Sequence, residues 1–318
     1  MPGSQKEKIK NLIHLYRRKR LLKALTKILF FNLSLLVFSC DKLSENNTKF
    51  TVKDDSGLEV KFDSHPQRII SLGPNITETF FELGADSLLA GVTEYCDYPS
   101  QAKTKTNTGS YLSPDYETIS SLNPDLIIIN VESSNNPTYQ SLKNMGFKLF
   151  LSHAKDLNGI YKMIGDIGKI TGLNQRADQL IKKISSELPD VSYSDVNSVS
   201  ALILIAVNPL MTTNDKTFIN EISELSGFKN IYAGESQDYP VINYEDVVKR
   251  NPDVIIFPAD TLNTAKNSEF EKEITEKMHN SGAVKTGNII FIDDDIMFRP
   301  GPRITEAVKT LRNKYKRY

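Results

Sequence analysis

The chain has 318 residues, enough for one large or two ordinary domains, and its 39 Lys and Arg residues balance 39 Asp and Glu residues. Nine of the basic residues but only one of the acidic residues lie within residues 1–40. Residues 41–318 therefore hold 30 basic and 38 acidic residues, a net charge of −8. Nucleic-acid binding depends on a basic face, so we expect no nucleic-acid partner.

Residues 1–39 have the pattern of an export signal. A basic region precedes a mainly apolar stretch of 11 residues, 28–38, which at about 1.5 Å per residue is too short to cross a hydrocarbon core of about 30 Å. The segment Val37–Cys40 resembles the lipobox of bacterial lipoproteins, whose cysteine is lipidated. We therefore predict a signal peptide over residues 1–39 and lipidation at Cys40. The alternative is an ordinary secretory signal with an incidental cysteine.

Residues 40–50 are polar and predict a flexible, lipidated tether. If Cys40 is acylated, Cys96 has no disulfide partner, and no histidine lies near it in the sequence. We therefore predict a packed thiol at Cys96 rather than a nucleophile.

From Arg68 on, apolar strands alternate with amphipathic helical stretches, and we predict an N-terminal lobe over residues 51–156. The stretch Leu126–Ile129 is wholly aliphatic, as expected for a strand whose two faces are both covered by helices. Apolar residues at helical spacing then run through residues 157–189, which predict one long linking helix with a weak point near Gly172. Residues 190–318 repeat the alternation as a C-terminal lobe. The predicted fold class is α/β, with two Rossmann-like lobes, mainly parallel sheets and one long inter-lobe helix.

A short phrase occurs once in each predicted lobe. Glu117 and Glu245 each open an amphipathic helical stretch that is followed by Asn-Pro-Asp and an aliphatic strand. The copies lie too far apart for a solenoid repeat. They predict two lobes of similar build, each with one acidic residue at an equivalent place. A carboxylate in the first turn of a helix also has a purely structural explanation, because the helix dipole favours it.

The sequence contains none of the common catalytic or nucleotide-binding motifs, so we predict that the protein is not an enzyme. The histidines beyond the export signal are isolated in the sequence and are expected to be packed or solvated. Asp293, Asp294 and Asp295 cannot all face one cation from an extended strand. We therefore predict a strand end with at most one functional aspartate, and no resident metal or cofactor.

Residues 68–102, 108–117 and 299–304, together with the two Asn-Pro-Asp units, resemble the class III periplasmic binding proteins of ABC importers, and within them the cobalamin-binding branch. The resemblance implies a cleft between two lobes that captures a small molecule and delivers it to an ABC permease dimer and its ATPase. It also implies an extracytoplasmic protein that acts as a monomer, here held at the membrane by its lipid anchor.

The resemblance also implies site residues. Aromatic side chains of both lobes would pack on a flat ligand, and Asp295 and Arg299 would bond its polar rim, although a structural ion pair also explains these two. Glu117 and Glu245 match docking glutamates that pair with arginines of the permease. The remaining implied ligand-binding residues are Tyr95, Tyr111, Tyr239, Met211 and Asn130.

The chain has no tryptophan, although the cobalamin-binding relatives place several in the cleft. Tyrosine supplies a rigid apolar face with a polar tip, so a corrinoid remains the predicted ligand. Haem is the alternative, because a tyrosinate can ligate its iron. Ferric siderophores rank third, because they are often anionic and the matched positions offer only Arg299 as a cation.

Overall fold

The computed structural model describes residues 49–189, 199–259 and 264–315. The predicted export signal, Cys40 and nearly all of the predicted tether lie outside these residues. Within the described residues, no helix is both long and apolar enough to cross a membrane.

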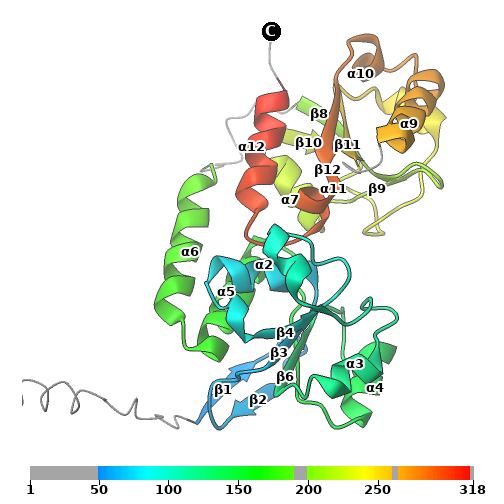
Figure 1. Ribbon diagram of the computed structural model, residues 1–318. Helices are drawn as coiled ribbons and strands as arrows, with labels where there is room; N and C mark the ends of the chain where they lie inside the picture. Colours follow the sequence, from blue (N-terminus) through cyan, green and yellow to red (C-terminus); the bar gives the residue numbers. More distant parts are fainter. Residues whose placement is uncertain (1–48, 190–198, 260–263, 316–318) are drawn as a thin grey trace, which may run out of the picture. The chain divides into compact units, whose positions relative to one another are not determined.

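The first lobe is built on a five-stranded sheet in the order β5-β4-β3-β6-β7 (Figure 1). All neighbouring strands are parallel. Every residue of the central strands β3 and β6 is buried, as the wholly aliphatic run predicted for β6. The elements of this lobe are β3 (Ile69–Leu72), α2 (Pro74–Glu82), β4 (Leu89–Val92), β5 (Thr106–Asn107), α3 (Tyr116–Ser121), β6 (Leu126–Ile129), α4 (Pro137–Asn144) and β7 (Leu149–Leu151), with short 3-10 helices at Asp86–Leu88 and Ser100–Thr104.

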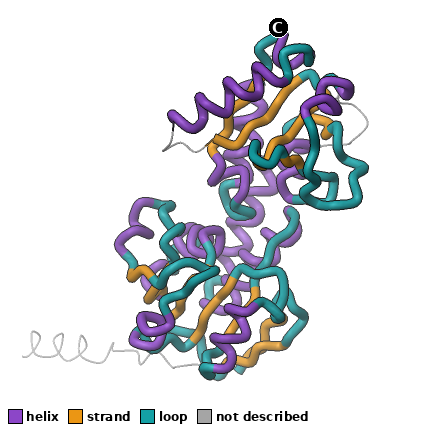
Figure 2. The backbone as a smooth tube through the Cα atoms, turned by 90° about the vertical axis from the view of Figure 1, so that its right-hand side faces the viewer, coloured by secondary structure: helices purple, strands orange, loops and turns teal. Residues whose placement is uncertain are grey.

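The second lobe repeats this plan with a parallel path β10-β8-β11-β12, to which β9 adds an antiparallel strand beside β8. Figure 2 shows the strands gathered in two groups, each surrounded by helices and loops. The elements are β8 (Val199–Ala206), β9 (Met211–Thr212), α7 (Phe218–Leu225), β10 (Phe228–Asn230), α8 (Tyr244–Arg250), β11 (Val254–Ala259), α9 (Thr264–Lys277), α10 (Gly282–Lys285), β12 (Ile289–Asp293), α11 (Asp294–Phe298) and α12 (Ile304–Lys314).

An antiparallel hairpin of β1 (Phe50–Lys53) and β2 (Glu59–Phe62) precedes the first lobe and has no counterpart among the predicted elements. Its strands are short and one face is exposed, so they carry little apolar signal. The buried Asp54 shapes the turn, because its carboxylate accepts hydrogen bonds from the backbone N–H groups of Ser56 and Leu58.

The predicted linking helix over residues 157–189 is broken at its predicted weak point, because two helices occupy this stretch: α5 (Leu157–Thr171) and α6 (Asn174–Glu187). Gly172 ends α5 in the left-handed conformation, with φ of 76°, which favours glycine. Helix α5 contacts α2 and β1 of the N-terminal part, whereas α6 contacts α12 of the second lobe. The pair therefore links the lobes as predicted.

The repeated phrase folds the same way twice. In both lobes an Asx side chain, Asp115 or Asn243, caps the helix whose second residue is the repeated glutamate. An asparagine of positive φ follows each helix, and the aspartate after it accepts hydrogen bonds at the start of the neighbouring strand. The phrase thus serves as a structural unit that ties a helix to the beginning of each central strand.

Candidate functional site

The strand order of the first lobe opens a crevice beside β3 and β6. The chain leaves β3 toward β4 on one side and returns to β6 on the other, and loops diverge at such a switch point. A cavity of about 610 Å³ lies there, lined by Gly73 after β3, by residues 130–133 after β6 and by His153 after β7. Ligand sites of open parallel sheets lie at these carboxyl ends.

The second lobe has the equivalent crevice at the carboxyl ends of β8 and β11, where a cavity of about 470 Å³ is lined by Ile205–Asn208, Phe257 and Phe298, among others. A third cavity, of about 220 Å³, takes side chains from both lobes, including His153 and Tyr239. It shares Asn130, Glu132 and His153 with the first cavity and Phe298 with the second. Together the three cavities form one candidate cleft.

Large apolar side chains remain exposed around this cleft. Tyr111 and Tyr239 line it and are 39% and 47% exposed, although a folded chain normally buries such surface. Asn130 also lines it, as the resemblance implied. Tyr95 is exposed but lines none of the three cavities. Met211 is half-buried in β9 and lines none of them either.

The tyrosine of the second lobe keeps its proton. Burial raises the pKa of Tyr239, and the nearby carboxylates of Asp238 and Glu132 raise it further. A neutral phenol can donate a hydrogen bond and stack on a flat ligand, whereas tyrosinate ligation of a metal requires loss of that proton.

His153 is half-buried, lines two of the cavities and belongs to a polar chain. Its Nδ1 lies 2.9 Å from Oδ1 of Asn130, whose Nδ2 lies 3.2 Å from Oδ1 of Asn75. Asn75 in turn donates through Nδ2 to the carbonyl oxygen of Pro300 in the second lobe, at 3.1 Å. Burial, with Lys155 nearby, lowers the pKa of His153 and favours the neutral imidazole. The signal that could have found it is its position directly beyond β7.

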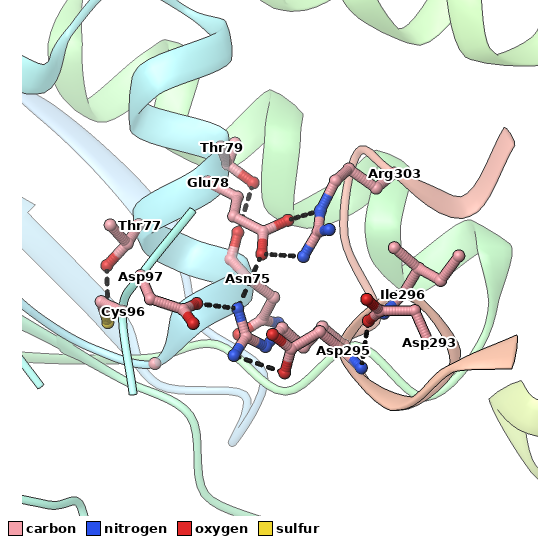
Figure 3. Close-up of polar contacts among 12 residues, drawn as sticks. Asn75, Thr77, Glu78, Thr79, Cys96, Asp97, Asp293, Asp295, Ile296 and Arg303 are labelled. Carbon is pink, nitrogen blue, oxygen red and sulfur yellow. Dashed lines mark hydrogen bonds and ion pairs between the residues drawn. The ribbon is translucent and has the colours of Figure 1, made fainter. Parts of the chain in front are cut away.

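A charged cluster joins the lobes beside the cleft. Glu78 of α2 is 1% exposed and accepts two hydrogen bonds from Arg303, at 2.7 and 2.9 Å, and one from Arg299 at 3.3 Å (Figure 3). The guanidinium of Arg303 also lies 4.0 Å from the ring centroid of Tyr98. Both arginines belong to the second lobe, so the cluster fixes the second lobe to the first.

The predicted rim residues Asp295 and Arg299 contact each other in this cluster. Arg299 is 2.5 Å from Asp295 through Nη2 and 2.8 Å from Asp97 through Nη1. Burial disfavours the arginine charge, but Asp97, Asp295 and Glu78 outweigh it and the pKa of Arg299 is raised. Burial also raises the pKa of Asp295 to about 6, although Arg299 acts against this shift. Neither residue lines the three cavities, and the ion-pair alternative describes their present contacts.

Asp293 and Cys96 have structural places. Asp293 ends β12, at the predicted strand end, and caps α11 by accepting from the backbone N–H groups of Asp295 and Ile296. Cys96 is a buried free thiol, 3.1 Å from the hydroxyls of Thr77 and Thr93, and burial raises its pKa. The prediction of a packed thiol at Cys96 is confirmed.

Glu117 and Glu245 hold equivalent places on the two lobes. Each is the second residue of its helix and is exposed. No ion pair to another described residue involves either carboxylate. The two acidic groups are therefore available for contact with another protein.

Comparison with known proteins places the chain in a family. Residues 69–296 match the family model described as periplasmic binding protein. The chain is 30% identical over 270 residues to an ABC transporter substrate-binding lipoprotein of Bacillus subtilis, an alignment that covers 82% of this chain and 83% of the relative. It is 25% identical to a cobalamin-binding protein of Halobacterium salinarum, with 83% and 73% covered.

The fold has solved counterparts. A periplasmic haem-binding protein of Roseiflexus sp. RS-1 superposes with a TM-score of 0.68 at 23% identity, covering 78% of this chain and 98% of that chain. The two-lobed α/β fold is thus shared with that haem-binding protein. The chain belongs to the periplasmic binding protein family and is an extracytoplasmic substrate-binding protein of an ABC importer rather than an enzyme.

Proposed function

We propose that the protein captures a corrinoid, a cobalamin-like ligand, in the cleft between its lobes and delivers it to the permease. The observation that carries this proposal is the pairing of exposed tyrosines with an amide-rich wall. Tyr111 lies beside the amides of Asn130, Asn135 and Asn136, and Tyr239 lines the adjoining cavity.

An amide offers both a hydrogen-bond donor and an acceptor, which suits the neutral amide groups around a corrin ring. Haem instead carries carboxylates, which cations bind best. Glu132 lines both cavities and would repel these carboxylates, whereas Lys155 and Lys216 line only the smaller of the two. The raised pKa of Tyr239 also opposes the tyrosinate that ferric haem would take as a ligand. The name of the relative from Halobacterium salinarum agrees with the corrinoid choice.

Titration followed by visible absorption tests the proposal. The purified protein is titrated with cyanocobalamin and, separately, with haemin, and both ligands report binding by their own absorption. We expect saturable one-to-one binding of cyanocobalamin. Saturable binding of haemin without binding of cyanocobalamin would overturn the corrinoid assignment in favour of haem.

We further propose that Cys40 carries the lipid anchor and that the protein acts as a monomer. The Val37–Cys40 motif supports the anchor, and one relative is named a lipoprotein. Incorporation of labelled fatty acid into the wild type but not into Cys40→Ala would support the anchor. Equal labelling of the two would refute it.

A further inference from the structure

The ring of His153 has one nitrogen committed to the protein and one directed to no other described side chain. Nδ1 lies 2.9 Å from Oδ1 of Asn130. None of the hydrogen bonds and ion pairs among the described residues uses Nε2, and the side chain lines the two cavities that adjoin Asn130. The state of Nε2 therefore decides what this residue can offer a ligand.

The polar chain behind His153 fixes that state. The carbonyl oxygen of Pro300 can only accept, so the Asn75 amide must present Nδ2 to it and Oδ1 toward Asn130. Asn130 must then donate through Nδ2 to Asn75, which leaves its Oδ1 to accept from His153. The proton of the neutral imidazole therefore sits on Nδ1, and Nε2 carries a free lone pair.

Close packing holds this chain in place. Asn75 is 1% exposed. A Cβ atom on Gly73 would lie 2.9 Å from Cβ of Asn130 and 3.1 Å from Oδ1 of Asn75. On the other side, a Cβ atom on Gly301 would lie 3.3 Å from Cβ of Asn75. Gly73 and Gly301, one in each lobe, thus let the backbone lie in direct contact with the asparagine side chains that orient the imidazole.

An imidazole whose Nδ1–H is held by an oxygen acceptor, with Nε2 open, is the arrangement that proteins use for metal-ligating histidines. Because the proposed function places a corrinoid in this cleft, we propose that Nε2 of His153 is an axial ligand to the cobalt of the bound corrinoid. The inference rests on that proposed function and assigns His153 a role in selecting the form of the ligand.

The step is a ligand exchange with no redox change. On an aquated corrinoid the bond between cobalt and its axial water breaks, the water leaves, and the Nε2 lone pair forms the new bond. The proton stays on Nδ1, bonded to Asn130. A corrinoid whose exchangeable position is held by cyanide offers no such place, so the protein should discriminate between the two forms.

The test compares aquacobalamin with cyanocobalamin on three proteins: the wild type, His153→Gln and His153→Ala. Gln retains an amide that can donate to Asn130 but cannot supply imidazole. Affinity is measured by calorimetry, and axial exchange is read from the visible spectrum. We expect a spectral shift of aquacobalamin on the wild type and a preference for it over cyanocobalamin of about tenfold or more. Both should be lost in the two variants, and free imidazole should restore the shift in His153→Ala.

The outcomes separate this inference from the proposed function. If aquacobalamin binds the wild type with no spectral shift, or if the shift persists in His153→Gln, the axial role is refuted while corrinoid capture stands. If neither corrinoid binds the wild type, both the axial role and the corrinoid assignment are refuted.

Discussion

The carboxylate of Glu78 and the guanidinium of Arg303 form a two-pronged ion pair between the lobes, with oxygen–nitrogen distances of 2.7 and 2.9 Å. Glu78 is almost fully buried, and Arg299 shares the same carboxylate. Removing one partner of a buried charge cluster leaves the others desolvated without compensation, which is costly.

Glu78→Gln should therefore destabilise the protein by about 3–5 kcal/mol, because two partly buried arginines lose their shared carboxylate. Urea unfolding measures the change. Glu82→Gln is the matched control, since Glu82 lies on the same helix but is exposed and should change stability by less than about 0.5 kcal/mol. Equal stabilities of the two variants would show that the cluster contributes nothing.

Much of the fold follows from the sequence because its signals are local. The buried strands β3 and β6 read as aliphatic runs, and Gly172, with its φ of 76°, marked the weak point of the linking helix. The ion pair between Glu78 and Arg303 joins residues 225 positions apart, and no local sequence pattern around either residue predicts it. The place of His153 could not be predicted for the same reason. Its contact with Asn130, and the contact of Asn130 with Asn75, form only when the chain folds.

Tyr111→Ala and Tyr239→Ala should each weaken corrinoid binding by about 2- to 12-fold, because each removes an aromatic contact worth about 0.5–1.5 kcal/mol. Their thermal stability should change little, since both rings are exposed. Leu58→Ala serves as the control, because Leu58 is 48% exposed in the β1–β2 turn and lines none of the three cavities. Unchanged affinity in both tyrosine variants would remove these residues from the site.

Asp295 should make stability depend on pH. Its pKa is raised from 3.8 to about 6 in the folded protein, so the folded state holds the proton more tightly than the unfolded state. The stabilisation from this group is thus fully present below about pH 4 and is lost as the pH rises through about 6. The stability of the wild type relative to Asp295→Asn should fall over that interval. A constant difference from pH 4 to pH 7 would contradict the raised pKa.

Glu117→Ala combined with Glu245→Ala should leave ligand affinity unchanged and abolish uptake, because both carboxylates are exposed and neither lines the three cavities. Uptake of labelled ligand by cells measures the loss. The control variant combines Glu59→Ala with Glu271→Ala, which removes the same charge from two other exposed positions. Wild-type uptake by the Glu117/Glu245 variant would refute docking through these residues.

Gly73→Ala should weaken corrinoid binding, because the new Cβ atom would lie 2.9 Å from Cβ of Asn130 and displace the amide that orients His153. Gly165→Ala is the control. An added Cβ there meets nothing within 4 Å, and alanine favours the helix by about 1 kcal/mol over glycine. Equal affinities of Gly73→Ala and the wild type would show that the wall of the cleft tolerates the displacement.

The ion pairs of Glu78 also bear on how the bound ligand is released. Opening the cleft at this point would separate Glu78 from Arg303 and give up two charge-assisted hydrogen bonds, of 2.7 and 2.9 Å. We expect the free energy for this separation to come from contact with the permease. Under the proposed docking, Glu117 and Glu245 give the permease one contact on each lobe. The Glu78–Arg303 ion pair would then favour retention of the ligand by the free protein and its release at the permease.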